Sequence, residues 1–263
     1  MKISVCGKGG SGKSAMVTLM AGAMRQRGYG VVVVDADESN STLHRMLGFD
    51  IPPRPLLELA GGKRMVKQAL GPKDASADPG ADTNVLSQHR IAVADLPSDF
   101  VLDRDRIRLI AVGKILQALE GCACPMGVLS REFLKKLRLG DDEVAIVDTE
   151  AGVEHFGRGV ETSIDAVLVV VEPSFESLQL AERVNALADG IGIASIWAVL
   201  NKVTSDEMAT RLSQELDRRG LEVAGTVHYD PRIFEAGLEG QPLDGSKAAE
   251  EVSDLVGGIF PQR

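Results

Sequence analysis

Short runs of aliphatic residues recur along this chain at intervals that predict buried β-strands. The runs are rich in valine and isoleucine, the last being the weakest, and they cover residues 3–6, 31–34, 109–112, 144–147, 167–171, 196–200 and 223–227. The runs at 31–34 and 167–171 contain no polar residue, so neither face of these strands suits contact with water. Strands that are apolar on both faces belong in the middle of a parallel sheet with helices on each side.

Segments with helical spacing separate these runs. Apolar residues between 16 and 23 recur at intervals of three and four, arginines follow, and Gly28 marks the stop. The segments at 178–188 and 208–216 have similar spacing. Alternation of strand and helix predicts an α/β fold, with a doubly wound, mainly parallel sheet flanked by helices. We expect one domain over residues 1–263.

One segment interrupts this alternation. Residues 71–90 are rich in proline, glycine and aspartate, which predicts a mobile surface loop and not a domain boundary. For residues 91–109 we expect a local strand pair.

The overall charge narrows the classes of partner. The formal net charge is -9 and the pI is about 5.1, which disfavours general nucleic-acid binding, although totals do not exclude a local basic patch. The three cysteines, Cys6, Cys122 and Cys124, are too few and too uneven for a secreted disulfide framework. The sequence contains neither a signal peptide nor an apolar run of about 18 residues. We therefore expect a cytoplasmic protein with no membrane or nucleic-acid partner.

Residues 7–14 read Gly-Lys-Gly-Gly-Ser-Gly-Lys-Ser and fit the phosphate-loop pattern G-x-x-x-x-G-K-[ST]. The loop follows a predicted strand and opens a predicted helix, which is the context that the motif requires. Glycines let backbone N–H groups approach phosphate oxygens, and the helix N-terminus adds its positive dipole end. Lys13 should reach the β- and γ-phosphates, and the Ser14 hydroxyl should bind Mg²⁺. The expected nucleotide-binding residues here are Gly7, Gly9, Gly10, Ser11, Gly12, Lys13, Ser14 and Ala15.

Carboxylates end two of the predicted strands. Asp35 and Asp37 follow the run at 31–34, and Asp148 follows the run at 144–147. The carboxyl ends of parallel strands form the ligand-binding edge of such sheets. An apolar strand ending in aspartate has the form of a Walker B motif, so Asp148 should hold Mg²⁺ through water. We expect Asp35 to orient waters of the same ion.

A Cys-x-Cys sequence lies outside the nucleotide motifs. Cys122 and Cys124 can bind one soft or borderline metal ion, such as Ni²⁺ or Zn²⁺. One chain does not readily complete a four-thiolate site, because Cys6 belongs beside the phosphate loop and is expected to pack in the core. Two chains related by a two-fold axis would supply four sulfurs, which predicts a homodimer with the metal at its interface.

The phosphate loop resembles a particular variant of the motif. G-K-G-G-x-G-K-[ST] is similar to the deviant Walker A of the nitrogenase iron protein, of septum-site and partition ATPases, and of tail-anchored-protein targeting ATPases. The resemblance implies that Lys8 reaches the ATP of a partner subunit and, with Lys13, serves hydrolysis. An added cation would stabilise the charge that develops on the phosphoryl oxygens. The resemblance also implies that Asp37 positions or activates the attacking water.

The same group indicates where the base would bind. Its members hydrogen-bond adenine through an asparagine at the end of a late strand, which Asn201 and Lys202 match. Tyr229 and Pro231 fall where the family closes over the base. A guanine-selective Asn-Lys-x-Asp pattern would need aspartate at position 204, and Thr204 therefore favours ATP over GTP.

Three further segments narrow the resemblance: residues 112–115, 120–125 and 148–159 are similar to the CooC-type ATPases, which insert nickel during maturation of carbon monoxide dehydrogenase. The likeness covers nearly the whole chain except residues 71–90, and it departs at Thr149, where methionine is expected. It implies ATP-dependent delivery of Ni²⁺ to the apo-form of the dehydrogenase. Glu154 and His155 invite a metal role, but we favour contacts with the partner subunit or the dehydrogenase.

Other interpretations remain open. An iron–sulfur electron-transfer ATPase would draw its cysteines from well-separated segments, and a partition or positioning ATPase would leave the Cys-x-Cys unexplained; a metal-binding scaffold without turnover is a third alternative. Each motif also has a purely structural interpretation: a glycine-rich turn, a solvated Lys8, a helix N-cap at 35–37, a strand-end turn at Asn201, and cysteines without a ligand.

Overall fold

The computed structural model describes residues 1–69, 85–114, 124–243 and 245–260. Its strands are β1 (Lys2–Gly7), β2 (Gly30–Asp35), β3 (Ile91–Ala92), β4 (Leu102–Arg104), β5 (Ile107–Ala111), β6 (Leu137–Arg138), β7 (Glu143–Asp148), β8 (Ala166–Val171), β9 (Ser195–Val203) and β10 (Glu222–His228). Its α-helices are α1 (Lys13–Gln26), α2 (Leu43–Met46), α3 (Leu56–Leu59), α4 (Gly62–Ala69), α5 (Cys124–Lys136), α6 (Glu154–Gly157), α7 (Phe175–Gly190), α8 (Asp206–Asp217), α9 (Pro231–Glu239) and α10 (Lys247–Ile259). Of the loop predicted at 71–90, residues 71–84 lie outside the described part of the chain.

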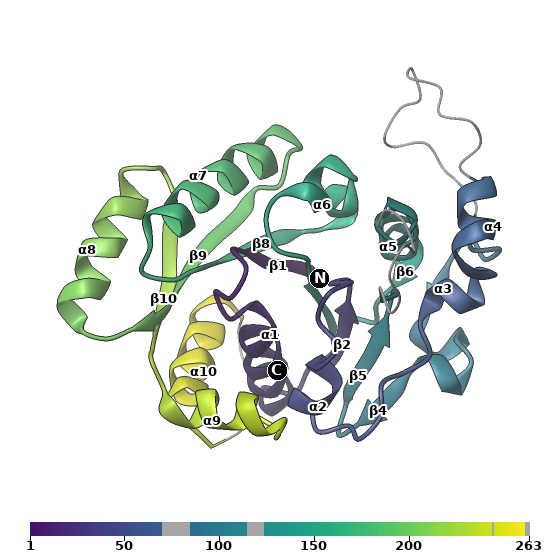
Figure 1. The fold of residues 1–263 in the computed structure, drawn as a ribbon, viewed down its shortest axis with the longest axis horizontal. Helices are drawn as coiled ribbons and strands as arrows, with labels where there is room; N and C mark the ends of the chain where they lie inside the picture. The colour runs from purple at the N-terminus through teal and green to yellow at the C-terminus, as the bar shows by residue number, and fades with distance from the viewer. Residues whose placement is uncertain (70–84, 115–123, 244, 261–263) are drawn as a thin grey trace.

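The main sheet has the strand order β10-β9-β8-β1-β7-β2-β5-β4. All neighbouring pairs are parallel except β4 and β5, which are antiparallel. The chain leaves β1 for β2 and β5 on one side and returns through β7 to β8, β9 and β10 on the other (Figure 1). This topology confirms the predicted doubly wound fold, and the β4–β5 pair confirms the local pairing expected near residues 91–109.

Helices cover both faces of the sheet, which explains the unbroken valine run in β2. Val31 and Val33 belong to the apolar core beneath α1 and α10, whereas Val32 and Val34 belong to the core on the other face, with α5 and α7 (Figure 1). Alternate residues of a strand point to opposite faces, so both faces of β2 must be apolar.

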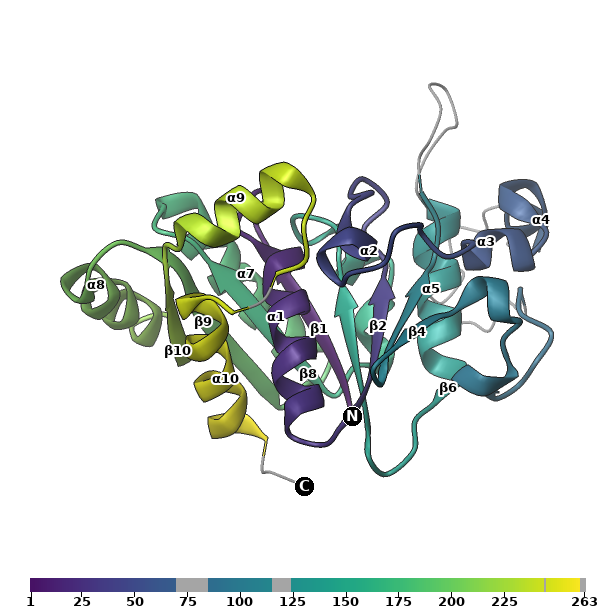
Figure 2. The same cartoon turned by 90° about the horizontal axis from the view of Figure 1, so that it is seen from below.

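Several of the described helices begin at a side chain that accepts a backbone hydrogen bond. Ser174, Ser205, Asp230 and Ser246 cap α7, α8, α9 and α10 in this way. Each such cap contributes about 1 kcal/mol to helix stability. Figure 2 shows α9 and α2 near the end of the sheet toward which the strands point. The helix starts and strand ends therefore gather polar groups at this edge.

Candidate nucleotide-binding site

The phosphate loop joins β1, in the middle of the sheet, to α1. At Gly7, with a φ of 149°, an added Cβ would lie 2.6 Å from the carbonyl oxygen of Val170 in β8. Gly12 has a φ of 95°, and a Cβ there would lie 2.4 Å from Nδ2 of Asn201. Only glycine fits either position, so the packing of the loop requires these two glycines whether or not a ligand is bound.

Free polar groups line the loop. The N-terminus of α1 has neither a side-chain cap nor an acidic residue in its first turn, so its N–H groups suit an anion. The Ser11 hydroxyl is buried and has no hydrogen-bond partner among the described residues. Lys13 is buried, and its Nζ donates to the Lys8 carbonyl oxygen over 3.4 Å. These groups fit phosphate oxygens.

Ser14 and Asp148 form the side of the site that fits Mg²⁺. The Ser14 hydroxyl donates to Oδ2 of Asp148 over 2.6 Å and accepts from Nδ2 of Asn40 over 2.6 Å. Asp148 is fully buried, and its Oδ1 has no hydrogen-bond partner in the described structure. Burial, followed by the nearby charge of Asp35, raises the pKa of Asp148 to about 7. A hydroxyl and an unpartnered carboxylate oxygen match the hard oxygen ligands that Mg²⁺ prefers.

Asp35 lies beside Asp148 because β2 and β7 pair these two residues directly. Its Oδ1 accepts from the Lys114 ammonium over 2.7 Å, a bond that the sequence did not reveal. Lys114 also donates to the carbonyl oxygens of Asp37 and Asn40. Burial raises the pKa of Asp35 to about 6, although the Lys114 charge opposes the rise. Lys114 therefore fixes the segment after β2. The only sign of this role in the sequence was the position of a lysine shortly after β5, at the edge of the sheet where ligands bind.

A local turn holds Asp37. Its Oδ1 accepts from the N–H and the hydroxyl of Ser39 over 2.9 Å and 2.6 Å, and from the Asn40 N–H over 3.3 Å. The carboxylate is thus oriented at the same sheet edge as Ser14 and Asp148. A role toward water remains a prediction.

Lys8 points to acidic residues of its own subunit. Its ammonium lies 3.2 Å from Glu172 Oε1 and 2.9 Å from Glu176 Oε2. Hydrogen bonds to Glu176 and then Glu172 raise the pKa of Lys8. The ammonium is therefore charged and lies beside the phosphate loop, and its action on a partner's nucleotide stays a prediction.

A pocket of about 510 Å³ adjoins the loop where the base is expected. Gly12, Asn201, Lys202, Tyr229, Ile233 and Phe234 are among the residues that line it. Nδ2 of Asn201 donates to the Ser11 carbonyl oxygen over 2.8 Å, and the Lys202 ammonium donates to that of Gly10. Pro231 begins α9 and is not in the lining, whereas Ile233 and Phe234 are lining residues that the sequence did not single out.

His155 is buried, which corrects the expectation that it contacts a partner. Its Nδ1 bonds Glu161, and its Nε2 lies 3.1 Å from the Gly152 carbonyl oxygen. Both ring nitrogens are engaged, so the imidazole is not available to a metal. Glu154 remains exposed, and its Oε2 accepts from the Val153 N–H over 3.0 Å.

A second charged cluster lies between the segments that follow β2 and β7. Nη1 of Arg158 contacts Oε1 of Glu150 and lies 3.6 Å from Oε1 of Glu38. Burial and the neighbouring Glu150 raise the pKa of Glu38 to about 8. No role was predicted for these side chains from the sequence.

The two cysteines in the described part of the chain lie in different places, one in the core and one at the start of a helix. Cys6 is fully buried in β1, where burial raises the pKa of its thiol, and this confirms its predicted place in the core. Cys122 lies outside the described residues, and Cys124 is the first residue of α5. Among the residues that the structure describes, no three histidine, cysteine or acidic residues gather to hold a metal ion.

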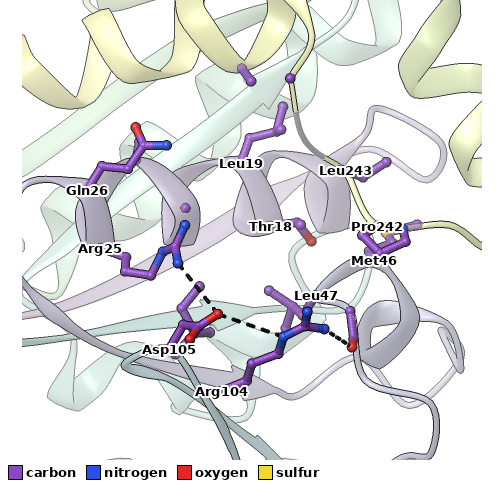
Figure 3. A pocket seen from close by; sticks show the side chains of 16 residues that line it. Thr18, Leu19, Arg25, Gln26, Met46, Leu47, Arg104, Asp105, Pro242 and Leu243 are labelled. Carbon is purple, nitrogen blue, oxygen red and sulfur yellow. Dashed lines mark hydrogen bonds and ion pairs between the residues drawn. The ribbon is translucent and has the colours of Figure 1, made fainter.

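Another hollow, of about 290 Å³, lies along α1 and includes residues near that helix's end (Figure 3). Figure 3 shows Arg25 and Arg104 turned toward Asp105. Oδ2 of Asp105 lies 3.8 Å from Nη1 of Arg25 and 3.8 Å from Nε of Arg104. Arg104 also donates to the Gly48 carbonyl oxygen over 2.6 Å. Because protein acceptors already engage both guanidinium groups, the loop at Gly7–Ser14 remains the better phosphate site.

In the part of the chain that is described, each helix is too short or too polar to cross a membrane.

Comparisons with known proteins agree with this geometry. The profile of the CobQ/CobB/MinD/ParA nucleotide binding domain matches residues 3–243. An uncharacterized ATP-binding protein of Methanocaldococcus jannaschii is 39% identical over 256 residues, spanning 97% of this chain and 98% of that protein. The carbon monoxide dehydrogenase accessory protein CooC of Rhodospirillum rubrum is 33% identical over 240 residues, 91% of this chain and 88% of that one.

A solved structure is similar to nearly the whole chain. The septum site-determining protein MinD of Pyrococcus horikoshii, complexed with Mg-ADP, has a TM-score of 0.69 and covers 99% of this chain and 96% of its own. The sequences are 18% identical, so this likeness shows a shared fold alone.

Proposed function

Since the chain belongs to the CobQ/CobB/MinD/ParA family of nucleotide-binding domains, we propose that it is a cytoplasmic, Mg²⁺-dependent ATPase that works as a homodimer and inserts nickel into carbon monoxide dehydrogenase. The observation that carries the ATPase proposal is the bond between Ser14 and the buried Asp148, whose other carboxylate oxygen has no partner among the described residues beside the phosphate loop. The nickel proposal rests on the Cys122-x-Cys124 sequence, together with the 33% identity to CooC over most of both chains.

The described side chains divide the work of hydrolysis. Lys13 and the N–H groups of the loop bind the β- and γ-phosphates, while the pocket beside Asn201 receives the adenine. Asp37 accepts a proton from the water that attacks the γ-phosphate, the bond to the β-phosphate oxygen breaks, and ADP and phosphate form. Ser14 and Asp148 would hold Mg²⁺, which when bound neutralises phosphate charge. Lys8 of the partner subunit adds a cation to the same oxygens.

The metal cargo binds where the two copies meet. Cys122 and Cys124 of each chain supply four thiolates to one Ni²⁺, or to Zn²⁺ in its place. ATP favours the closed dimer, and hydrolysis opens it so that the ion passes to the apo-dehydrogenase. Linkage then requires that the nucleotide change the affinity for the metal, and that the metal change the affinity for the nucleotide.

Metal titration of purified variants tests this proposal. Cys122→Ala and Cys124→Ala should each abolish stoichiometric Ni²⁺ and Zn²⁺ binding by the dimer, read by native mass and metal content. Cys6→Ala is the matched control and should keep the metal, because that thiol is buried in the core. Lys13→Ala should lose ATP binding and keep the thiolates. Unchanged metal stoichiometry in both cysteine variants, or a monomer at saturating ATP and Mg²⁺, would refute the proposal.

A further inference from the structure

Arg158 contacts the two segments that follow β2 and β7, the strands that end in Asp35 and Asp148. Its guanidinium bonds Glu150, two residues after Asp148, and approaches Glu38, the residue after Asp37. These side chains are largely shielded, with exposed fractions of 24% for Arg158, 19% for Glu150 and 7% for Glu38. The guanidinium contacts the Glu150 carboxylate and a Glu38 carboxyl group whose raised pKa favours the protonated form, so Arg158 holds the two segments together.

The other end of the Arg158 side chain rests on helix α5. An added Cβ at Gly127 would lie 2.5 Å from Cδ and 3.2 Å from Cβ of Arg158, so this glycine provides the space for the arginine stem. Nη1 of Arg131, also on α5, donates to the Arg158 carbonyl oxygen over 3.3 Å. Helix α5 begins at Cys124, three residues before Gly127. One residue thus contacts both nucleotide-side segments and the first turns of the helix that starts at the Cys-x-Cys.

We propose that Arg158 is the positioning residue that couples nucleotide binding to metal binding. This inference rests on the function proposed above. Packed protein interiors transmit displacement because they contain little free volume, and the Gly127–Arg158 contact has none to spare. A shift of Glu38 or Glu150 toward the nucleotide moves the guanidinium, and the stem carries the shift to the start of α5. By reciprocity, metal binding at the cysteines biases the same two segments.

A double-mutant cycle tests the contact chain. The measured quantity is the ratio of Ni²⁺ dissociation constants in MgADP and in Mg²⁺ with a non-hydrolysable ATP analogue. We expect a ratio of about 5 or more in the wild type, and of about 1 in Arg158→Ala, Arg158→Gln and Gly127→Ala. Since Gly127→Ala acts by displacing Arg158, it should change the ratio no further when added to Arg158→Ala. Arg218→Ala, which removes an exposed pair with Glu215 on α8, is the matched control and should keep the wild-type ratio.

Thermal unfolding supplies a second readout. In the wild type, Gly127→Ala should lower the melting temperature, because its Cβ would lie 2.5 Å from Cδ of Arg158. In Arg158→Ala that Cδ is absent and alanine is the better helix former, so the same change should lower the melting temperature by about 2–4 °C less. A wild-type ratio in Arg158→Ala and Arg158→Gln, or additive effects of the two changes, would overturn this inference alone. A wild-type protein that binds no Ni²⁺ would overturn the proposed function and this inference with it.

Discussion

The carboxylate of Asp148 is completely buried and has one oxygen without a partner among the described residues; burial, followed by the charge of Asp35, raises its pKa to about 7. A cation binds the ionised form, so the bound proton must leave first. We therefore expect MgATP affinity to rise about tenfold per pH unit below pH 7 and to level off above it. Titration of wild-type protein with MgATP from pH 5.5 to 8.5 measures this, and Asp148→Asn should be weak and insensitive to pH. A flat wild-type profile would contradict the assignment of Asp148 to Mg²⁺.

Glu38 makes the stability of the fold depend on pH. Its pKa in the folded protein, about 8, lies above the ordinary glutamate value, so folding favours the protonated acid. The stability that it contributes is complete below about pH 4.5 and is lost as pH rises through 8. We predict that the melting temperature falls between pH 5 and 8 and that Glu38→Gln reduces this fall by a few degrees. Glu207→Gln on the exposed side of α8 is the control, and a fall of equal size in Glu38→Gln would argue against the prediction.

At the scale of elements, α9 forms one wall of the expected base pocket. Phe234 lines that pocket and is 61% exposed, and no residue of α9 is buried. Phe234→Ala should weaken ATP binding about 5–10-fold through loss of contact with the base, because a base–aromatic contact contributes about 1–3 kcal/mol. It should leave the melting temperature and the affinity for tripolyphosphate nearly unchanged. Ile191→Ala, an exposed apolar residue after α7, is the control, and equal losses for ATP and tripolyphosphate would place the base elsewhere.

The sheet strands buried in the core and the helices α1, α7 and α8 could be predicted from the sequence, whereas α5, α10 and the short helices were not. Each predicted aliphatic run proved to be a strand, because strands buried on both faces must be apolar throughout. Helices α2 and α3 have four residues each, too few for a periodic pattern to appear. Helix α9 was also missed, and none of its apolar residues is fully buried: Ile233 and Ala236 pack against the edge of a core, whereas Phe234 and Leu238 are exposed.

The site divides in the same way. The phosphate loop is contiguous, so its residues and even its glycine geometry could be read from the sequence. The proximity of Asp35 and Asp148 follows from parallel strand ends. By contrast, Lys114 meets Asp35 across 79 positions, and Arg158 meets Glu38 across the loops of two strands. Such contacts depend on strand register and rotamer, which a single sequence does not specify.

At the scale of the whole molecule, Lys8 is shared between its own subunit and the proposed dimer. To act on a partner's ATP, its ammonium must leave Glu172 and Glu176. Glu176→Gln weakens the internal pair, and we expect ATP-dependent dimerisation to strengthen by up to about fivefold, the range for an exposed ion pair. Lys8→Ala should abolish ATP-dependent dimerisation. Sedimentation with a non-hydrolysable analogue measures both, and weaker association of Glu176→Gln would show that the pair supports the dimer.

The sealed thiol of Cys6 makes the central strand a natural reporter of unfolding. Its sulfur has no exposure and a raised pKa, so an alkylating reagent can reach it only when β1 separates from β7 and β8. In a chain whose other two cysteines are replaced by alanine, the rate of alkylation would report how often the sheet opens at β1. Stabilisation of the fold by bound nucleotide could then be followed as a slower alkylation of Cys6, without a dye or a mutation in the core.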